Sequence, residues 1–185
     1  MSPRFLLLLG LAFASAVRGD ESVSVCHGYG CLVQEDIAFT DARLTMLGNA
    51  LKLAEDAASE RAILAGVIGR MYAWAGEQSD IRNDRGGNYA DAGIPGKMDC
   101  IDHSISTTRL LALLAARGDL RWHRVLTPES RKFLKIFAAH WSAVIAENGG
   151  DEAARFVVDS WFVDNGQPAV ILPLEEWKKG AGPDV

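Results

Sequence analysis

One cysteine at the start of an apolar helical pattern constrains this chain more than any other feature. Apolar residues recur every three to four positions over 101–114, which predicts a helix with one buried face. Asp99 is a suitable N-cap, and Pro95 and Gly96 are typical of a loop that enters a helix. Cys100 then lies in the first helical turn, where free N–H groups and the helix dipole stabilise a thiolate, the nucleophilic form. A small buried cysteine that fills a gap in the core is the alternative interpretation.

Two later segments, joined by a strong turn signal, carry groups that would activate this thiol. The first is a predicted strand that carries His140 near its start, and the second is a predicted strand that carries Asp159. Gly149 and Gly150 lie between them and predict a hairpin. A turn centred between the two glycines pairs residues whose numbers sum to 299. It therefore predicts that His140 faces Asp159, with Cβ atoms about 5 Å apart.

The order of these three residues resembles the transglutaminase-like branch of the papain-like fold. The run Asp99-Cys100-Ile101-Asp102 resembles the D-C-x-D start of bacterial transglutaminase-like cysteine proteinases. His140-Trp141 and Val158-Asp159-Ser160-Trp161 resemble the H-x-W and V-D-x-x-W neighbourhoods of the transglutaminase core. The likeness covers roughly residues 95–165. The chain departs from the family pattern where Trp141 directly follows the histidine and where His103 replaces an aromatic residue.

The resemblance implies both a fold and a chemistry. The fold is α+β, with N-terminal helices and a cysteine-bearing helix packed on a small antiparallel sheet. The chemistry is thiol-dependent acyl transfer or amide hydrolysis, with Cys100 as nucleophile, His140 as base and Asp159 as the residue that orients it. The substrate would be a peptide, a protein or a small amide, and no metal or organic cofactor is implied. A catalytically inactive papain-like domain that binds a peptide or protein is the alternative.

Two other residues are weighed as members of the site. Gln78 ends a predicted helix and is a candidate oxyanion donor, because a glutamine has this role in papain-like enzymes. His123 lies in a predicted strand at 120–126 and is a rival for the role of the base. No aspartate-bearing strand pairs with His123 through an obvious turn, so His140 is favoured.

The chain has three cysteines, and their spacing predicts how they are used. Four residues separate Cys26 from Cys31, and two of them are glycines, so a small disulfide can close there in an oxidising compartment. This pairing leaves Cys100 as a free thiol. The alternatives are a bridge between Cys31 and Cys100, which would rule out thiol catalysis, and a metal site that includes His27.

The first 19 residues are typical of an export signal. Arg4 precedes an apolar run over 5–13, and Ala14-Ser15-Ala16 offers a cleavage site. The run is too short to span a bilayer, although an uncleaved anchor is the alternative. We therefore expect a bacterial periplasmic or secreted protein with no stable membrane anchor after cleavage. We do not expect nucleic acid as a partner, because the net charge is −5 and there is no basic stripe with interleaved aromatic residues.

The remaining chain is predicted to form one domain over 20–178, followed by a disordered tail over 179–185. The coarse pattern predicts two helices at 40–57 and 59–78, a long loop at 79–97 and a polar link at 128–135. A short strand at 170–172 and a last helical turn at 174–178 complete the expected order.

Overall fold

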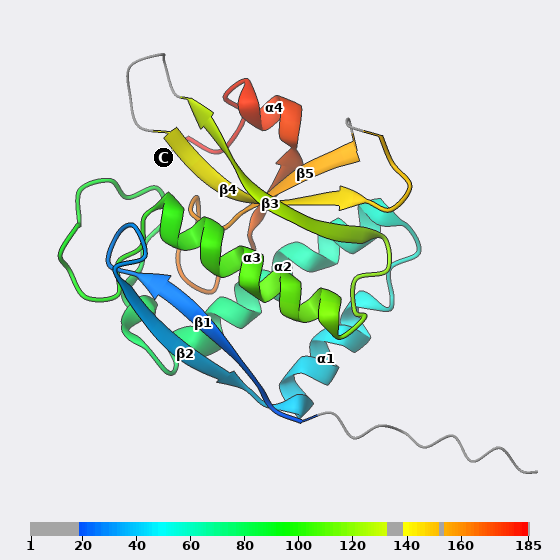
Figure 1. Cartoon of the computed structure of the whole chain (residues 1–185), viewed down its shortest axis with the longest axis horizontal. Helices are drawn as coiled ribbons and strands as arrows, with labels where there is room; N and C mark the ends of the chain where they lie inside the picture. Colours follow the sequence, from blue (N-terminus) through cyan, green and yellow to red (C-terminus); the bar gives the residue numbers. More distant parts are fainter. Residues whose placement is uncertain (1–18, 133–138, 152–153, 185) are drawn as a thin grey trace, which may run out of the picture.

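The computed structural model of the chain describes residues 19–132, 139–151 and 154–184, and the predicted export signal lies outside them apart from Gly19. Strands, helices and one 3-10 turn follow one another along the chain, as Figure 1 shows. Their order is β1 (Glu21–His27), β2 (Val33–Phe39), α1 (Asp41–Leu51), α2 (Ala57–Gly76), η1 (Asp80–Asn83), α3 (Cys100–Ala116), β3 (His123–Lys132), β4 (Ala139–Glu147), β5 (Arg155–Asp159), β6 (Val170–Pro173) and α4 (Leu174–Lys178). The fold is therefore α+β, as the sequence predicts.

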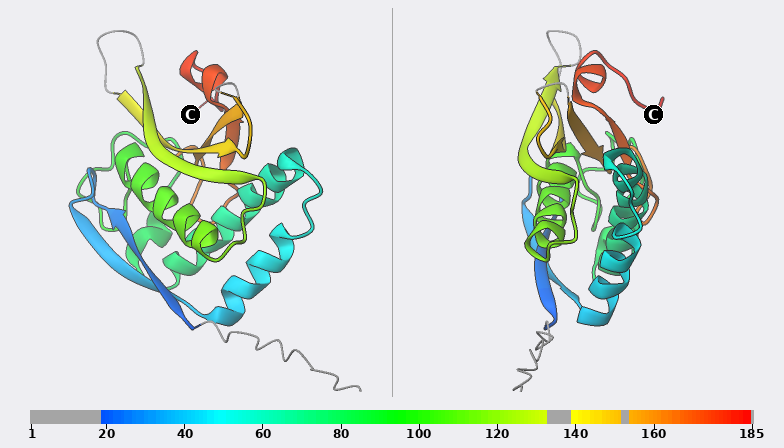
Figure 2. Two further views of the ribbon diagram at one scale, coloured as in Figure 1. Left: turned by 45° about the vertical axis from the view of Figure 1, so that its right-hand side comes forward. Right: turned by 90° about the vertical axis from the view of Figure 1, so that its right-hand side faces the viewer.

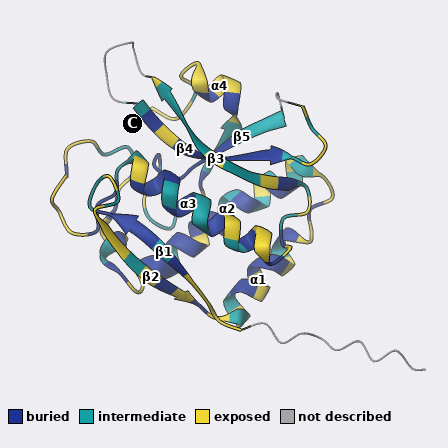
Figure 3. Ribbon diagram, viewed as in Figure 1, coloured by how far each residue is buried: buried dark blue, intermediate teal, exposed yellow. Residues whose placement is uncertain are grey.

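Helix α3 is the element around which the others are arranged. It lies between the β1–β2 hairpin and an antiparallel sheet of order β3-β4-β5-β6 (Figure 1). Seen from the side, α1 and α2 form a second layer behind α3 and the hairpin (Figure 2). Burial is concentrated where these layers meet (Figure 3), and buried apolar side chains of α1, α2, α3, the hairpin and the sheet form the main core. A second cluster joins Val144 and Val157 of the sheet to Leu174 and Trp177 of α4. None of the described helices is long and apolar enough to cross a membrane.

The helices begin where the sequence offers caps. Asp99 starts α3 because its side chain accepts hydrogen bonds from the N–H groups of Ile101 and Asp102, and Asp102 closes a capping box. Asp56 does the same for α2, together with Ser59. This second cap shows why α1 ends at Leu51 and not near residue 57 as predicted: the chain between them must leave the helix to form the cap.

Strand β3 differs from the sequence prediction of a short strand followed by a polar link. It continues through Pro128 to Lys132, with a change of register between Leu126 and Glu129. Proline cannot donate to a strand ladder, but it is tolerated on an edge strand and at a bulge. Both conditions hold here, since β3 is an edge of its sheet.

The register of β4 and β5 also differs from the predicted one. The paired residues sum to 301, for example Ala143 with Val158, whereas a turn centred between Gly149 and Gly150 predicts 299. The chain between Ala146 and Arg155 is thus a longer connection than a tight hairpin. A shift of two residues keeps every side chain on the same face of a strand, so His140 and Asp159 still share a face.

The described residues after α4, 179–184, belong to the predicted disordered tail, and Ala181 among them contacts strand β3. The N–H of Ala181 donates to the carbonyl of Glu176, and Arg131 donates to the carbonyl of Ala181 at 2.7 Å. Arg131 also donates to the carbonyl of Trp177 at 2.8 Å. One arginine of β3 therefore binds the chain on both sides of residue 180.

Candidate active site

Cys100 is the first residue of α3 and the free cysteine of the chain. Its sulfur lies 3.7 Å from the carbonyl oxygen of Ala139, the residue directly before His140. The start of α3 thus meets the start of β4, which is the approach that a cysteine–histidine pair requires. The predicted alternative of a Cys31–Cys100 bridge is wrong, because Cys31 is bonded to Cys26.

The electrostatic surroundings of Cys100 differ from those expected of a helix start. Burial raises the pKa of the Cys100 thiol, and the negative charges of Asp99 and Asp159 raise it further. Hydrogen bonds from the backbone N–H groups of Trp141 and of Cys100 itself lower the pKa but do not compensate. The raised pKa favours the protonated thiol, so a nearby base that takes the proton would assist attack by the sulfur.

His140 is held by a carboxylate in a wall of aromatic rings. Its Nε2 lies 2.7 Å from Oδ2 of Asp159, and Asp159 also accepts a hydrogen bond of 2.9 Å from Nε1 of Trp177. The imidazole centroid lies 4.8 Å from that of Trp161 and 5.4 Å from that of Phe162. Within the described part of the chain, Nδ1 has no hydrogen-bond partner. The second ring nitrogen is thus available to a group in the neighbouring pocket.

Cys100 and His140 line one pocket of about 730 Å³. Besides the start of α3, its walls come from the β1–β2 turn, the loop before α3, strands β3 and β4, the turn after β5 and the segment after α4. The remaining lining residues are Tyr29, Asn88, Tyr89, Asp99, Arg131, Ala139, Trp161, Phe162, Gly180, Gly182, Pro183 and Asp184. A pocket of this volume, with aromatic walls and several polar groups that face its interior, is typical of a site for a small molecule or a peptide side chain.

The rival histidine, His123, lies in a closed network. Its Nδ1 lies 2.8 Å from Oε1 of Glu60, and its Nε2 lies 3.0 Å from Nη1 of Arg61. Because an arginine always donates, Nε2 accepts and Nδ1 donates, so both ring nitrogens are used. His123 does not line the pocket. His103 is likewise buried, between Asp84 at 2.9 Å and Ser160 at 2.8 Å.

Gln78, the predicted oxyanion donor, is not brought to the pocket. Its amide nitrogen donates to the carbonyls of Ala38 and Trp74, and its oxygen accepts from the N–H of Ala38. The glutamine instead fastens the end of α2 to strand β2. A glutamine at a helix end satisfies backbone groups wherever a strand edge is near, and the sequence does not indicate that edge.

Sequence reasoning missed several residues of the pocket and one that lies behind it. Arg131, in the predicted polar link, and Tyr29, in the predicted disulfide loop, line the pocket. Trp177, in the predicted last helical turn, donates to the carboxylate of Asp159. None of them is part of a local motif. Only the closure of the β1–β2 loop by Cys26 and Cys31 gave a signal, because it predicts that Tyr29 is held at a fixed place.

The Cys26–Cys31 disulfide is present, as the sequence predicts. Together with Asp102, the two sulfurs form a group of possible metal ligands whose atoms lie within 4.8 Å of one another. A metal needs thiolates, and both sulfurs are bonded to each other. The alternative of a Cys/His metal site therefore does not apply to the oxidised protein. A disulfide indicates an oxidising, extracytoplasmic environment.

Comparison with protein-family models, with curated proteins and with solved structures finds no match for this chain. The argument for a function therefore rests on the chemistry of the pocket.

Proposed function

We propose that this chain is an exported thiol enzyme of papain-like, transglutaminase-like architecture that catalyses acyl transfer or amide hydrolysis. The observation that carries the proposal is the meeting of Cys100 and His140 in one pocket, with the far ring nitrogen of His140 on the Asp159 carboxylate at 2.7 Å. A nucleophile, a base and a group that orients the base are the three parts that covalent acyl transfer needs.

The reaction begins from a protonated thiol. As the sulfur of Cys100 bonds to the carbonyl carbon, its proton passes to Nδ1 of His140, and the imidazolium is stabilised by Asp159. The tetrahedral intermediate then loses its amine, which receives that proton, and a thioester remains. Water attacks the thioester in a hydrolase, whereas an amine attacks it in a transglutaminase. Either acceptor regenerates the thiol.

The start of α3 supplies one donor for the oxyanion. The Asp99 carboxylate accepts from the N–H groups of Ile101 and Asp102 and not from that of Cys100, a residue that lines the pocket, so the N–H of Cys100 is the candidate donor. This N–H lies at the positive end of the helix dipole, where a developing negative charge is stabilised. Loss of one oxyanion donor typically costs roughly 3 kcal/mol of transition-state stabilisation.

Acylation by an activated ester tests the proposal without knowledge of the natural substrate. The purified protein is mixed with p-nitrophenyl acetate, release of nitrophenol is followed, and the modified peptide is identified by mass spectrometry. We expect an acetyl group on Cys100 in the wild type, none in Cys100→Ala, and about 100-fold slower acylation in His140→Ala. Equal rates in wild type and His140→Ala would contradict the proposal.

A second candidate function is a binding module without chemistry. The observation in its favour is that burial raises the pKa of Cys100, which leaves an unreactive thiol unless His140 acts as a base. Such a module would bind its peptide or protein with the same affinity in Cys100→Ala as in wild type, and its thiol would resist acylation. The ester experiment above therefore separates the two functions.

A further inference from the structure

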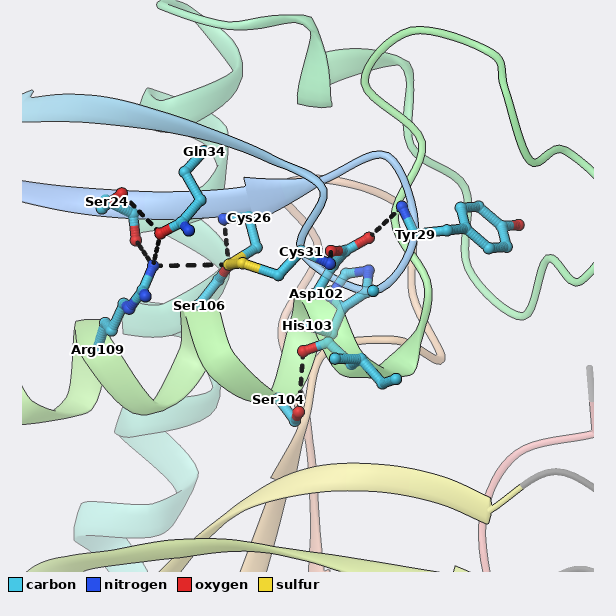
Figure 4. The surroundings of a disulfide bond; sticks show 12 residues. Ser24, Cys26, Tyr29, Cys31, Gln34, Asp102, His103, Ser104, Ser106 and Arg109 are labelled. Atoms are coloured by element: carbon cyan, nitrogen blue, oxygen red, sulfur yellow. Dashed lines mark hydrogen bonds between the residues drawn. A yellow bond between two sulfur atoms is a disulfide. The ribbon is translucent and has the colours of Figure 1, made fainter.

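The disulfide loop lies directly on the first turn of the Cys100 helix, as Figure 4 shows. The N–H groups of Tyr29 and Cys31 donate to the two oxygens of Asp102, at 2.8 and 2.6 Å. The N–H of Gly30 donates to Oδ2 of Asp99 at 3.0 Å. Asp99 and Asp102 are the capping box of α3, so three consecutive backbone N–H groups bind the two carboxylates that flank Cys100.

The loop holds these N–H groups in a backbone conformation that other segments rarely adopt. Four consecutive residues, 28–31, have positive φ, and two of them are not glycine: Tyr29 at 70° and Cys31 at 60°. Non-glycine residues remain in this region only when their surroundings hold them there. Successive N–H groups in a tight turn form a concavity that binds anions. The disulfide closes this turn at its two ends.

We propose that the Cys26–Cys31 disulfide controls the reactivity of Cys100, so that the site is active when the disulfide is formed and weakly active when it is reduced. The inference rests on the proposed role of Cys100 as nucleophile and adds a redox control to it. Reduction by a thiol reductant transfers two electrons and two protons to the disulfide and gives two thiols, while the reductant becomes a disulfide. The thiol enzyme would then remain weakly active in a reducing compartment and become active after export.

The control passes through Asp99. The charge of its carboxylate raises the pKa of the Cys100 thiol, and the N–H of Gly30 partly balances that charge. A reduced loop is free to leave the left-handed conformation, and the N–H of Gly30 then no longer binds Asp99. The uncompensated carboxylate disfavours the thiolate more strongly, so proton removal from Cys100 becomes harder.

The disulfide loop also contacts the loop before Cys100, which forms one wall of the pocket. The hydroxyl of Tyr29 donates to Oδ1 of Asp91 at 2.5 Å, and Asp91 forms an ion pair of 2.9 Å with Lys97. The first contact joins the disulfide loop to the loop that precedes Cys100, and the second lies within that preceding loop. The N–H of Gly28 adds a bond of 2.8 Å to the carbonyl of Lys97. Opening of the disulfide would therefore also loosen one wall of the pocket.

Other charged or titratable groups face the Cys100 sulfur or its pocket, and they do not depend on the loop in this way. They are Asp159 of β5, His140 of β4, Arg131 of β3, Tyr89 of the loop before α3 and Asp184 of the segment after α4. Within the described residues, none of these side chains forms a hydrogen bond with residues 26–31. A change in the reactivity of Cys100 that follows loss of the disulfide is thus assigned to Asp99 and to the pocket wall formed by the loop before Cys100.

The test is the pH dependence of Cys100 alkylation by iodoacetamide in wild type and in the double variant Cys26→Ser/Cys31→Ser. We expect the midpoint of the rate profile to move upward by roughly one pH unit, which lowers the rate at neutral pH about tenfold. Gln34→Ala is the matched control, because Gln34 joins the same hairpin to Arg109 farther along α3. Its midpoint should equal that of wild type.

Asp99→Asn tests the path of the control, since asparagine is an equally good N-cap without the charge. In that background, removal of the disulfide should move the midpoint by much less than in wild type. If the double variant does not fold, wild type is reduced by a phosphine, treated with iodoacetamide and analysed peptide by peptide, so that Cys100 is measured separately from Cys26 and Cys31. The proposal predicts slower labelling of Cys100 in the reduced protein.

The two proposals fail in different ways. An unchanged midpoint in the folded double variant, or unchanged Cys100 labelling after reduction, overturns the redox control even if ester acylation occurs. A shifted midpoint without any acylation of Cys100 overturns the proposed enzyme function, while the coupling between disulfide and thiol stands.

Discussion

The His140–Asp159 and His123–Glu60 pairs have similar geometry, and they differ in what the second ring nitrogen meets. His140 lies 2.7 Å from Asp159, and His123 lies 2.8 Å from Glu60. In the His123 pair, Arg61 binds the remaining nitrogen and both side chains are completely buried. In the His140 pair, the remaining nitrogen has no partner among the described residues, and the ring lines the pocket. A closed pair stabilises the fold, whereas an open pair can accept a proton.

The largest effect should follow from breaking the closed pair. Glu60 binds His123 and the N–H groups of Arg121 and Trp122, so Glu60→Ala leaves several buried donors without partners. We expect a loss of about 3–5 kcal/mol in the free energy of unfolding, measured by urea denaturation. Glu55→Ala, at an exposed neighbouring position, should change it by less than about 0.5 kcal/mol. A small effect of Glu60→Ala would show that the network is not structural.

The next effect separates the two histidines by reactivity. His140→Ala should slow alkylation of Cys100 at neutral pH by about 100-fold, because the thiol loses its base. His123→Ala should leave the alkylation rate of the folded protein unchanged, although that protein is less stable. Equal slowing in the two variants would mean that distortion of the fold, and not proton transfer, sets the rate.

A smaller effect concerns the third partner of Asp159. Trp177→Phe keeps the ring but removes the N–H that binds Oδ2 of Asp159, so acylation should slow by about fivefold, or roughly 1 kcal/mol. Trp122→Phe is the matched control, because Nε1 of Trp122 is buried without a hydrogen-bond partner among the described residues. It should leave both the acylation rate and the stability nearly unchanged. An equal loss of acylation rate in both variants would show that the hydrogen bond from Trp177 to Asp159 has no specific role in the site.

The smallest effect is the acid dependence of the closed pair. Burial raises the pKa of Glu60, but hydrogen bonds from His123 and from the N–H groups of Arg121 and Trp122 outweigh it, and the net pKa is lowered. A lowered pKa in the folded state gives stability that is present above the unfolded pKa of about 4.3 and lost as the pH falls through the folded pKa. Urea denaturation between about pH 3 and 7 should show this loss in wild type and not in Glu60→Gln.

The sequence predicts local features of this fold well, because they depend on neighbouring residues. The N-cap at Asp99, the start of α3 at Cys100 and the disulfide of Cys26 and Cys31 all follow from short-range patterns. The predicted register of β4 and β5 differs from the observed one by two residues, because the two glycines alone do not determine the length of the connection. The side chains of His140 and Asp159 nevertheless meet, since an even shift preserves the face.

The parts of the site that the sequence does not predict all depend on long-range packing. Trp177 reaches Asp159 from α4. Arg131 reaches the pocket from the second half of β3, a strand that the sequence predicts to end before Pro128. Gln78 has the right chemistry for an oxyanion donor but is bound to β2, whose pairing with β1 the sequence does not indicate. The surroundings of Cys100 are also partly long-range: burial and the charge of Asp159, together with that of the neighbouring Asp99, raise the pKa of its thiol.

The central claim is that Cys100, His140 and Asp159 act as one unit, and a double-mutant cycle on ester acylation tests it most directly. Acylation of Cys100 is measured in wild type, His140→Ala, Asp159→Asn and the double variant. Because the carboxylate acts only through the imidazole, the account predicts that Asp159→Asn slows wild type strongly and slows His140→Ala hardly at all. The account is contradicted if each substitution slows acylation independently, so that the two fold-losses in rate multiply in the double variant.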